Sequence, residues 1–145
     1  MSRAVSGPDL LQLHIDGASR GNPGEAGFGV FATDIKGVEV ASLYGYIGRA
    51  TNNVAEYQAL IHALRYARAR GATSVHVFSD SELVVRQVNG QYRVKHPDMR
   101  ALHREAESLL SSFRDAKVAH VRREQNKQAD RLANQALDER RSKLD

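Results

Sequence analysis

A long helical pattern followed at once by a short β-type segment is the feature that most limits how this chain folds. Residues 52–70 repeat apolar side chains at helical spacing and stop at Gly71, and residues 75–79 then read Val-His-Val-Phe-Ser. A helix between two strands of one sheet forms a crossover, so strand 75–79 is expected to pair in parallel with an earlier strand. The pattern therefore favours an α/β protein with a mixed sheet.

Three strands are expected before that helix. Apolar and polar residues alternate over residues 11–16, a period of two that is typical of a strand. Residues 28–34 and 38–47 are expected to form the next two strands and to complete an antiparallel meander. The stretch 17–27 holds four glycines and Pro23, which predicts a turn.

The rest of the chain is expected to consist of helices and one strand. The expected segments are a short helix 81–89, a loop 90–98, a helix 99–113, a strand 117–121 and a helix 125–140. The chain then divides into a disordered lead 1–9, one domain 10–140 and a tail 141–145.

Bulk properties limit the class of protein. The chain of 145 residues fits one domain, and its net charge of +4 favours a polyanionic partner. It has no cysteine, which excludes disulfides and thiolate metal sites. No apolar run reaches the ~20 residues of a membrane span, and the first residues lack the apolar region of a secretion signal. We therefore expect a cytoplasmic monomer without membrane contact.

Two aspartates follow expected strands directly. Asp16 ends the first strand and Asp80 ends strand 75–79. Ligands of α/β proteins bind beyond the carboxyl ends of parallel strands, so these carboxylates are candidates for a shared site. The alternative is that Asp16 caps a turn and Asp80 caps the next helix.

Two more acids lie at helix starts. Glu56 falls on the apolar stripe of helix 52–70, where a carboxylate needs a cation or donors. The alternative is that Glu56 is a first-turn acid whose negative charge is stabilised by the helix dipole. Asp130 lies at the rim of the last helix, where pairing with Lys127 or Arg131 is the alternative. Four carboxylates together would suit Mg²⁺ or Mn²⁺, and two such ions ~3.5–4 Å apart catalyse in-line displacement at phosphorus.

With these residues in view, the chain resembles the type 1 ribonuclease H family over about residues 10–140. The motifs that carry the resemblance lie at 16–24, 49–56, 79–81 and 126–133. The resemblance implies a five-stranded mixed sheet in the order 3-2-1-4-5 flanked by helices. It also implies Mg²⁺-dependent hydrolysis of the RNA strand of RNA/DNA hybrids, with Mn²⁺ as a substitute, leaving 5′-phosphate and 3′-hydroxyl ends.

The resemblance assigns roles to individual residues. Asp16, Glu56, Asp80 and Asp130 would be the catalytic residues that hold the metal ions, with Glu56 near the RNA 2′-hydroxyl. Asn126 matches a family position close to the last aspartate. The residues expected to contact the substrate are Asn22 at the RNA minor groove, Asn52 and Asn53 at bases and sugars, Arg49 and Thr51 at a DNA phosphate, and Ser81.

The chain departs from many bacterial members at three places. Only residues 90–98 stand where those members insert a basic handle, so Arg93, Lys95 and His96 are expected to replace it in part. This is typical of the compact, handle-less branch. The loop before Asp130 has no histidine, which leaves Arg122, Arg123 or Glu124 in its place, and Glu82 replaces a glutamine of the family.

Two other functions remain open at this point. One is a nuclease of the same fold that also cuts double-stranded RNA. The other is a non-catalytic nucleic-acid-binding module, against which the presence of all four acids argues.

Overall fold

The computed structural model describes residues 9–145, so the expected lead 1–9 lies, except for Asp9, outside the described residues. The elements in chain order are β1 (Leu10–Gly21), β2 (Gly24–Thr33), β3 (Glu39–Ala50), α1 (Asn52–Ala69), β4 (Ser74–Ser79), α2 (Glu82–Val88), α3 (Pro97–Ser111), β5 (Asp115–His120), the 3-10 turn η1 (Arg123–Gln125) and α4 (Lys127–Glu139).

The five strands form one mixed sheet in the order β3-β2-β1-β4-β5, as expected. β1 pairs antiparallel with β2, and β2 with β3. β4 lies parallel to β1 on its other side, and β5 lies parallel to β4. The crossover through α1 therefore produces the parallel pairing that its position in the chain predicted.

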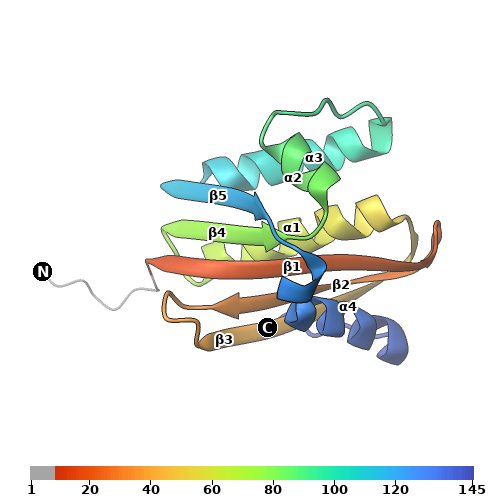
Figure 1. Cartoon of the computed structure of the whole chain (residues 1–145), viewed down its shortest axis with the longest axis horizontal. Helices are drawn as coiled ribbons and strands as arrows, with labels where there is room; N and C mark the ends of the chain where they lie inside the picture. The colour runs from red at the N-terminus through yellow and green to blue at the C-terminus, as the bar shows by residue number, and fades with distance from the viewer. Residues whose placement is uncertain (1–8) are drawn as a thin grey trace, which may run out of the picture.

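Helices cover the two faces of the sheet unequally (Figure 1). α1 packs on β1 and β2 on one face, with α3 against α1 and α2 against β5. α4 lies on the opposite face and packs on β1, β2 and β3. The apolar side chains between the sheet and α1 form the main core, whose members include Leu11, Leu13, Ile15, Leu60, Leu64, Val75 and Val77.

The prediction of a turn over residues 17–27 is wrong. β1 runs on to Gly21 and β2 begins at Gly24, so only Asn22 and Pro23 connect them. Several of these glycines serve close packing instead. A Cβ at Gly17 would lie 2.3 Å from the carbonyl carbon of Ala55, so only glycine lets β1 pass this close to α1.

The ends of the described chain are held by the sheet. The Asp9 carbonyl accepts hydrogen bonds from the amides of Thr73 and Ser74, at the start of β4. Near the other end, Lys143 and Tyr44 of β3 exchange two backbone hydrogen bonds, of 2.7 and 2.9 Å. Within residues 9–145 no helix is long and apolar enough to cross a lipid bilayer.

Candidate active site

Strand register brings Asp16 and Asp80 together. The parallel ladder between β1 and β4 ends on the pair Ile15 and Ser79; Asp16 is the next residue of β1, and Asp80 directly follows the last residue of β4. Both carboxylates therefore leave the same edge of the sheet on neighbouring strands. Asp80 is not the cap of α2, because Ser81 takes that role and its Oγ accepts a 3.3 Å hydrogen bond from the Val84 amide.

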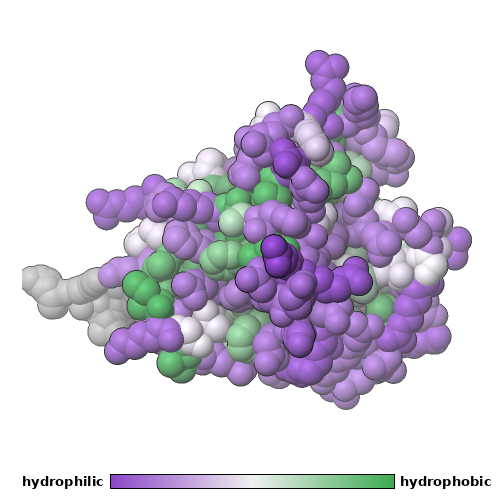
Figure 2. Space-filling model, in the orientation of Figure 1, coloured by the Kyte–Doolittle hydropathy of each residue, from purple (hydrophilic) through white to green (hydrophobic). Residues whose placement is uncertain are grey.

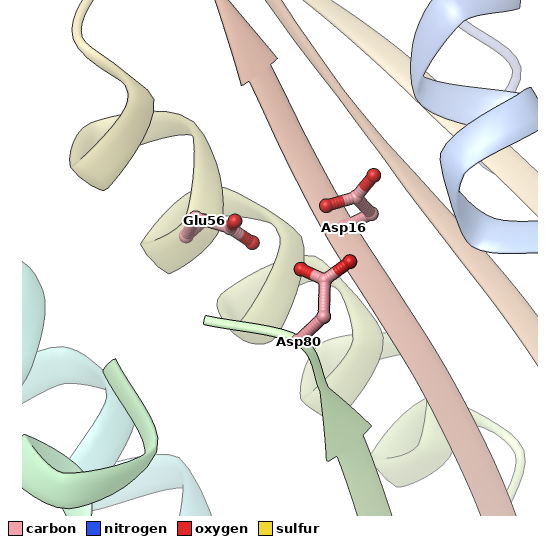
Figure 3. Close-up of side chains that lie close together, drawn as sticks. All are labelled: Asp16, Glu56 and Asp80. Atoms are coloured by element: carbon pink, nitrogen blue, oxygen red, sulfur yellow. The ribbon is translucent and has the colours of Figure 1, made fainter. Parts of the chain in front are cut away.

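Glu56 reaches the same point from the first turns of α1. It lies on the sheet-facing side of the helix and is 8% exposed. Its Oε1 accepts a 2.9 Å hydrogen bond from the Gly17 amide, which ties α1 to β1 directly beside Asp16. One oxygen from each of Asp16, Glu56 and Asp80 lies within 4.8 Å of the others, and Figure 3 shows the three carboxylates turned toward one another.

Asp130 lies at the margin of this cluster. It belongs to the first turn of α4, is exposed, and lies close enough to Asp16 to raise the pKa of that carboxyl. Among residues 9–145 it forms no ion pair with Lys127 or Arg131, and the Arg131 guanidinium donates to Gln128 instead. The structure thus brings Asp130 next to the other three acids, although it is not one of the tight trio.

The electrostatics of the cluster favour a cation. Burial raises the pKa of Asp16 to about 8, with further contributions from the charges of Asp80 and Asp130. Burial and the charges of Asp16 and Asp80 also raise the pKa of Glu56 well above its ordinary value, against the lowering effect of the Gly17 amide and Arg123. Carboxylates that repel one another in a desolvated position are stabilised by a bound metal ion.

Asn126 fixes the start of α4 against β1. Its side chain is 1% exposed, and Nδ2 donates a 2.9 Å hydrogen bond to the Ile15 carbonyl, next to Asp16. The Asn126 carbonyl in turn accepts from the Asp130 amide at 3.1 Å. The resemblance placed this asparagine near the last aspartate, and the hydrogen bonds give the physical reason for its presence there.

The acids lie in an open hollow of about 380 Å³. Asn52, Asn53 and Ser81, three of the expected substrate residues, line it beside the four acids. The hollow is completed by residues 17–19 and Arg123. Polar groups thus surround the acids on the open side, where a substrate would enter.

The other three expected substrate residues lie outside the hollow. The Thr51 side chain caps α1 and accepts from the Val54 amide at 3.2 Å. Asn22 accepts from the Asn52 amide at 3.1 Å and so holds the β1–β2 turn against the start of α1. Arg49 is exposed near the end of β3, where it lies opposite Glu25 in the register of β2 and β3.

A second hollow, of about 530 Å³, adjoins the first through Asn53. Arg93, Lys95 and His96, the expected partial replacements of the basic handle, line it. Only residues 89–96 connect α2 to α3, so the structure has no handle at this position. Glu82 pairs with Arg86 on α2 at 2.8 Å and does not line the hollow that contains the acids.

Some lining residues were not identified from the sequence. Residues 17–19 were assigned to a turn because of their neighbouring glycines, and they instead extend β1 past Asp16 along the hollow. Arg123 was one of three candidates to replace the missing loop histidine. It alone of residues 122–124 lines the hollow, and its charge acts on Glu56.

Comparison with known proteins gives consistent matches. The family model described as "Reverse transcriptase-like" matches residues 14–136. Ribonuclease HI of Halobacterium salinarum is 44% identical over 139 residues, which cover 94% of this chain and 70% of that protein. The bifunctional protein Rv2228c of Mycobacterium tuberculosis is 49% identical over 128 residues, or 87% of this chain, but the match spans only 35% of its length.

The fold comparison agrees with these matches. The crystal structure of LC11-RNase H1 in complex with an RNA/DNA hybrid superposes with a TM-score of 0.86 at 40% identity. The match covers 90% of this chain and 98% of that one. The sheet order and the flanking helices are therefore shared with proteins of similar sequence.

Proposed function

This chain belongs to the type 1 ribonuclease H family, and from that premise we propose that it hydrolyses the RNA strand of RNA/DNA hybrids in a reaction that requires divalent metal ions. The observation that carries the proposal is the convergence of Asp16, Glu56 and Asp80 within 4.8 Å in an open, polar hollow. A hybrid is also the ligand of the related LC11-RNase H1.

The residues of the cluster fit a hard divalent cation. All their ligand atoms are carboxylate oxygens, which Mg²⁺ prefers and Mn²⁺ accepts. We assign Asp16, Glu56 and Asp80 as metal ligands, with Asp130 completing the set from α4. When bound, the ions would activate the attacking water and stabilise the leaving oxygen, which gives a 5′-phosphate and a 3′-hydroxyl.

The chain's own residues hold this arrangement in place. The Gly17 amide orients the Glu56 carboxylate, and Asn126 keeps α4 against β1 so that Asp130 stays beside Asp16. Asn52 and Asn53 lie at the start of α1, where amides and side chains can reach the bases and sugars of a bound hybrid.

The remaining assignments concern contacts around the hollow. We assign the role of the missing loop histidine to Arg123, which lines the hollow, and expect it to favour a phosphate near Glu56. Ser81 faces the cleaved strand, Asn22 reads the RNA minor groove, and Arg49 with Thr51 seats a DNA phosphate. All four acids come from one chain, so we expect a monomer to be active.

The test is cleavage of an end-labelled RNA/DNA hybrid with Mg²⁺, beside matched double-stranded RNA and DNA. We expect cutting of the hybrid RNA that stops with EDTA, and products that a polymerase extends from their 3′ ends. Cutting of double-stranded RNA as well would assign the broader nuclease, and binding without any cutting would assign the non-catalytic module.

Asp80→Asn is the informative variant for this test. Loss of a group that only orients a metal ligand costs about 10–100-fold, so loss of a ligand is expected to cost more. Asp115→Asn, at the exposed start of β5, is the matched control and should cut at the wild-type rate. Near-wild-type activity of Asp80→Asn would contradict the assignment of the site.

A further inference from the structure

The sheet face opposite α1 is only partly covered. α4 packs there on β1, β2 and β3, and within residues 9–145 no helix packs on this side of β4 and β5. Figure 2 views this face and shows apolar surface over β4 and β5 with hydrophilic surface around it. The open area begins at β1, which contains Asp16, and at β4, which ends one residue before Asp80.

Aromatic and histidine rings gather on this open area. His14 and Phe78 are direct partners in the β1–β4 ladder, and their rings stack with centroids 4.9 Å apart. His76 meets the edge of Phe78 at 6.3 Å, and Phe31 lies 6.3 Å from His14. All four side chains are partly exposed. We call His14, Phe31, His76 and Phe78 the ring cluster.

The composition around the ring cluster favours nucleotides over a protein partner. Two cross-strand rows of the ladders make up the area: Phe31, His14, Phe78 and Ala119, and Thr33, Gln12, His76 and Lys117. These two rows contain no Leu, Ile, Val, Met or acidic residue, and the next row on the same face, farther from the acids, is Leu10, Ser74 and Asp115. Planar rings with a cationic neighbour are how proteins hold unpaired bases and their phosphates, and an open sheet face is a common platform for this.

One segment separates the ring cluster from the acids. Arg123 lines the hollow that contains the acids, whereas residues 124–128 wall a smaller hollow of about 250 Å³ together with His14 and Phe31. Lys127 supplies a cation there and Glu124 an anion. A strand that leaves the catalytic hollow over η1 would therefore come next to the ring cluster. Under the proposed function the acids act on RNA, so we take that strand to be the RNA.

We propose that the ring cluster binds unpaired nucleotides of the RNA strand where that strand continues beyond the hybrid. The proposal rests on the hybrid-cutting function and adds a substrate class to it, namely hybrids with a single-stranded RNA extension. Bases stack on the His14 and Phe78 rings, and Lys117 lies beside their phosphates.

The test compares cleavage of one hybrid with flush ends, with a single-stranded RNA extension, and with a single-stranded DNA extension. The RNA extension is placed at one end and then at the other. We expect the RNA extension to lower KM by on the order of tenfold, the range of one stacked base, without changing kcat. We call this fall in KM the gain. An equal fall in KM with the DNA extension, or no fall with any extension, would overturn the proposal.

Two variants on the open area separate the effect of the ring cluster and its neighbouring lysine from effects on folding and on overall charge. Phe78→Leu removes the ring but keeps apolar bulk, and Lys117→Glu changes an exposed side chain. Each should abolish the gain from the RNA extension while leaving KM for the flush hybrid unchanged. Lys36→Glu, at the exposed β2–β3 turn, makes the same charge change and should keep the gain. A loss of the gain in Lys36→Glu as large as in Lys117→Glu would refute a local site.

A second measurement keeps this inference distinct from the proposed function. Failure to cut the flush hybrid would contradict the nuclease assignment. The ring cluster can still be tested without cleavage, by fluorescence anisotropy of a labelled single-stranded RNA. Binding that Phe78→Leu weakens on the order of tenfold supports the cluster. Binding that is absent, or that Phe78→Leu leaves unchanged, overturns it.

Discussion

Replacing Asp16 by asparagine should stabilise the metal-free protein at pH 8, because the change removes a charge that the fold holds in a desolvated position beside other acids. Asparagine has nearly the shape of the protonated carboxyl and keeps the contacts of the neutral form. The variant therefore separates the cost of the buried charge, from desolvation and from the neighbouring acids, from the packing around it.

The size of the effect follows from the pKa of Asp16, which burial first, and then Asp80 and Asp130, raise from 3.8 to about 8. At about 1.36 kcal/mol for each pKa unit, ionising this carboxyl in the folded protein costs on the order of 5 kcal/mol. Because the pKa of Asp16 is higher in the folded state, the folded protein is relatively most stable at pH values below the unfolded pKa. This stability is lost as the pH rises toward the folded pKa. The variant should thus gain about 3–5 kcal/mol at pH 8 and under about 1 kcal/mol at pH 4.

Urea unfolding in EDTA, followed by circular dichroism at both pH values, measures this difference. With a urea dependence of about 1–3 kcal/mol per molar, the midpoint at pH 8 should rise by about 1 M or more. Asp115→Asn is the control and should stay within about 0.5 kcal/mol of the wild type at both pH values. Equal stability of Asp16→Asn and wild type at pH 8 would refute the argument that burial and the neighbouring acids destabilise the ionised Asp16 carboxylate.

Magnesium should reverse the order of stability. A ligand that binds only the folded state raises the free energy of unfolding, and the wild type holds the fuller set of carboxylates. We expect Mg²⁺ to raise the unfolding midpoint of the wild type more than that of Asp16→Asn. An equal rise in both would show that Asp16 is not a ligand.

Three further outcomes are expected. Gly17→Ala places a Cβ 2.3 Å from the Ala55 carbonyl carbon, so it should lower the free energy of unfolding by about 1–3 kcal/mol and displace Glu56. A thermal melt and the hybrid assay measure both effects, and a stable, fully active variant would contradict the close approach. Tyr57→Phe removes a buried 2.6 Å hydrogen bond to Gln87 and should destabilise by about 1–3 kcal/mol, with KM for the hybrid unchanged. KM for the hybrid should rise steeply between about 50 and 200 mM salt, and a salt-independent KM would exclude binding led by phosphate contacts.

Local patterns in the sequence were sufficient to predict most of the fold. The helical repeat of α1 and its position before β4 determined the crossover, and so the parallel pairing that aligns Asp16 with Asp80. The position of Glu56 on the buried stripe of α1 was also readable, because helical periodicity fixes which side chains share a face. These features depend on residues close together in the chain.

The features that were missed depend on contacts between distant segments. The glycines after Asp16 were interpreted as a turn, since a sequence does not show that α1 passes close to Gly17. The role of Asn126 as a bond from α4 to the Ile15 carbonyl likewise needs two elements more than a hundred residues apart. The ring cluster was invisible for the same reason, because each of its histidines alone is an ordinary strand residue.

The four acids lie on β1, on α1, directly after β4 and on α4, and this wide separation along the chain has a consequence for how activity arises. No contiguous fragment shorter than residues 16–130 carries them all. A metal ion that needs the whole set recognises only the completed domain, so its binding energy is available to the last step of folding and to none of the earlier ones. Recovery of nuclease activity during refolding should therefore lag behind recovery of helix content, and a partly folded chain is inert rather than a weaker or less specific enzyme.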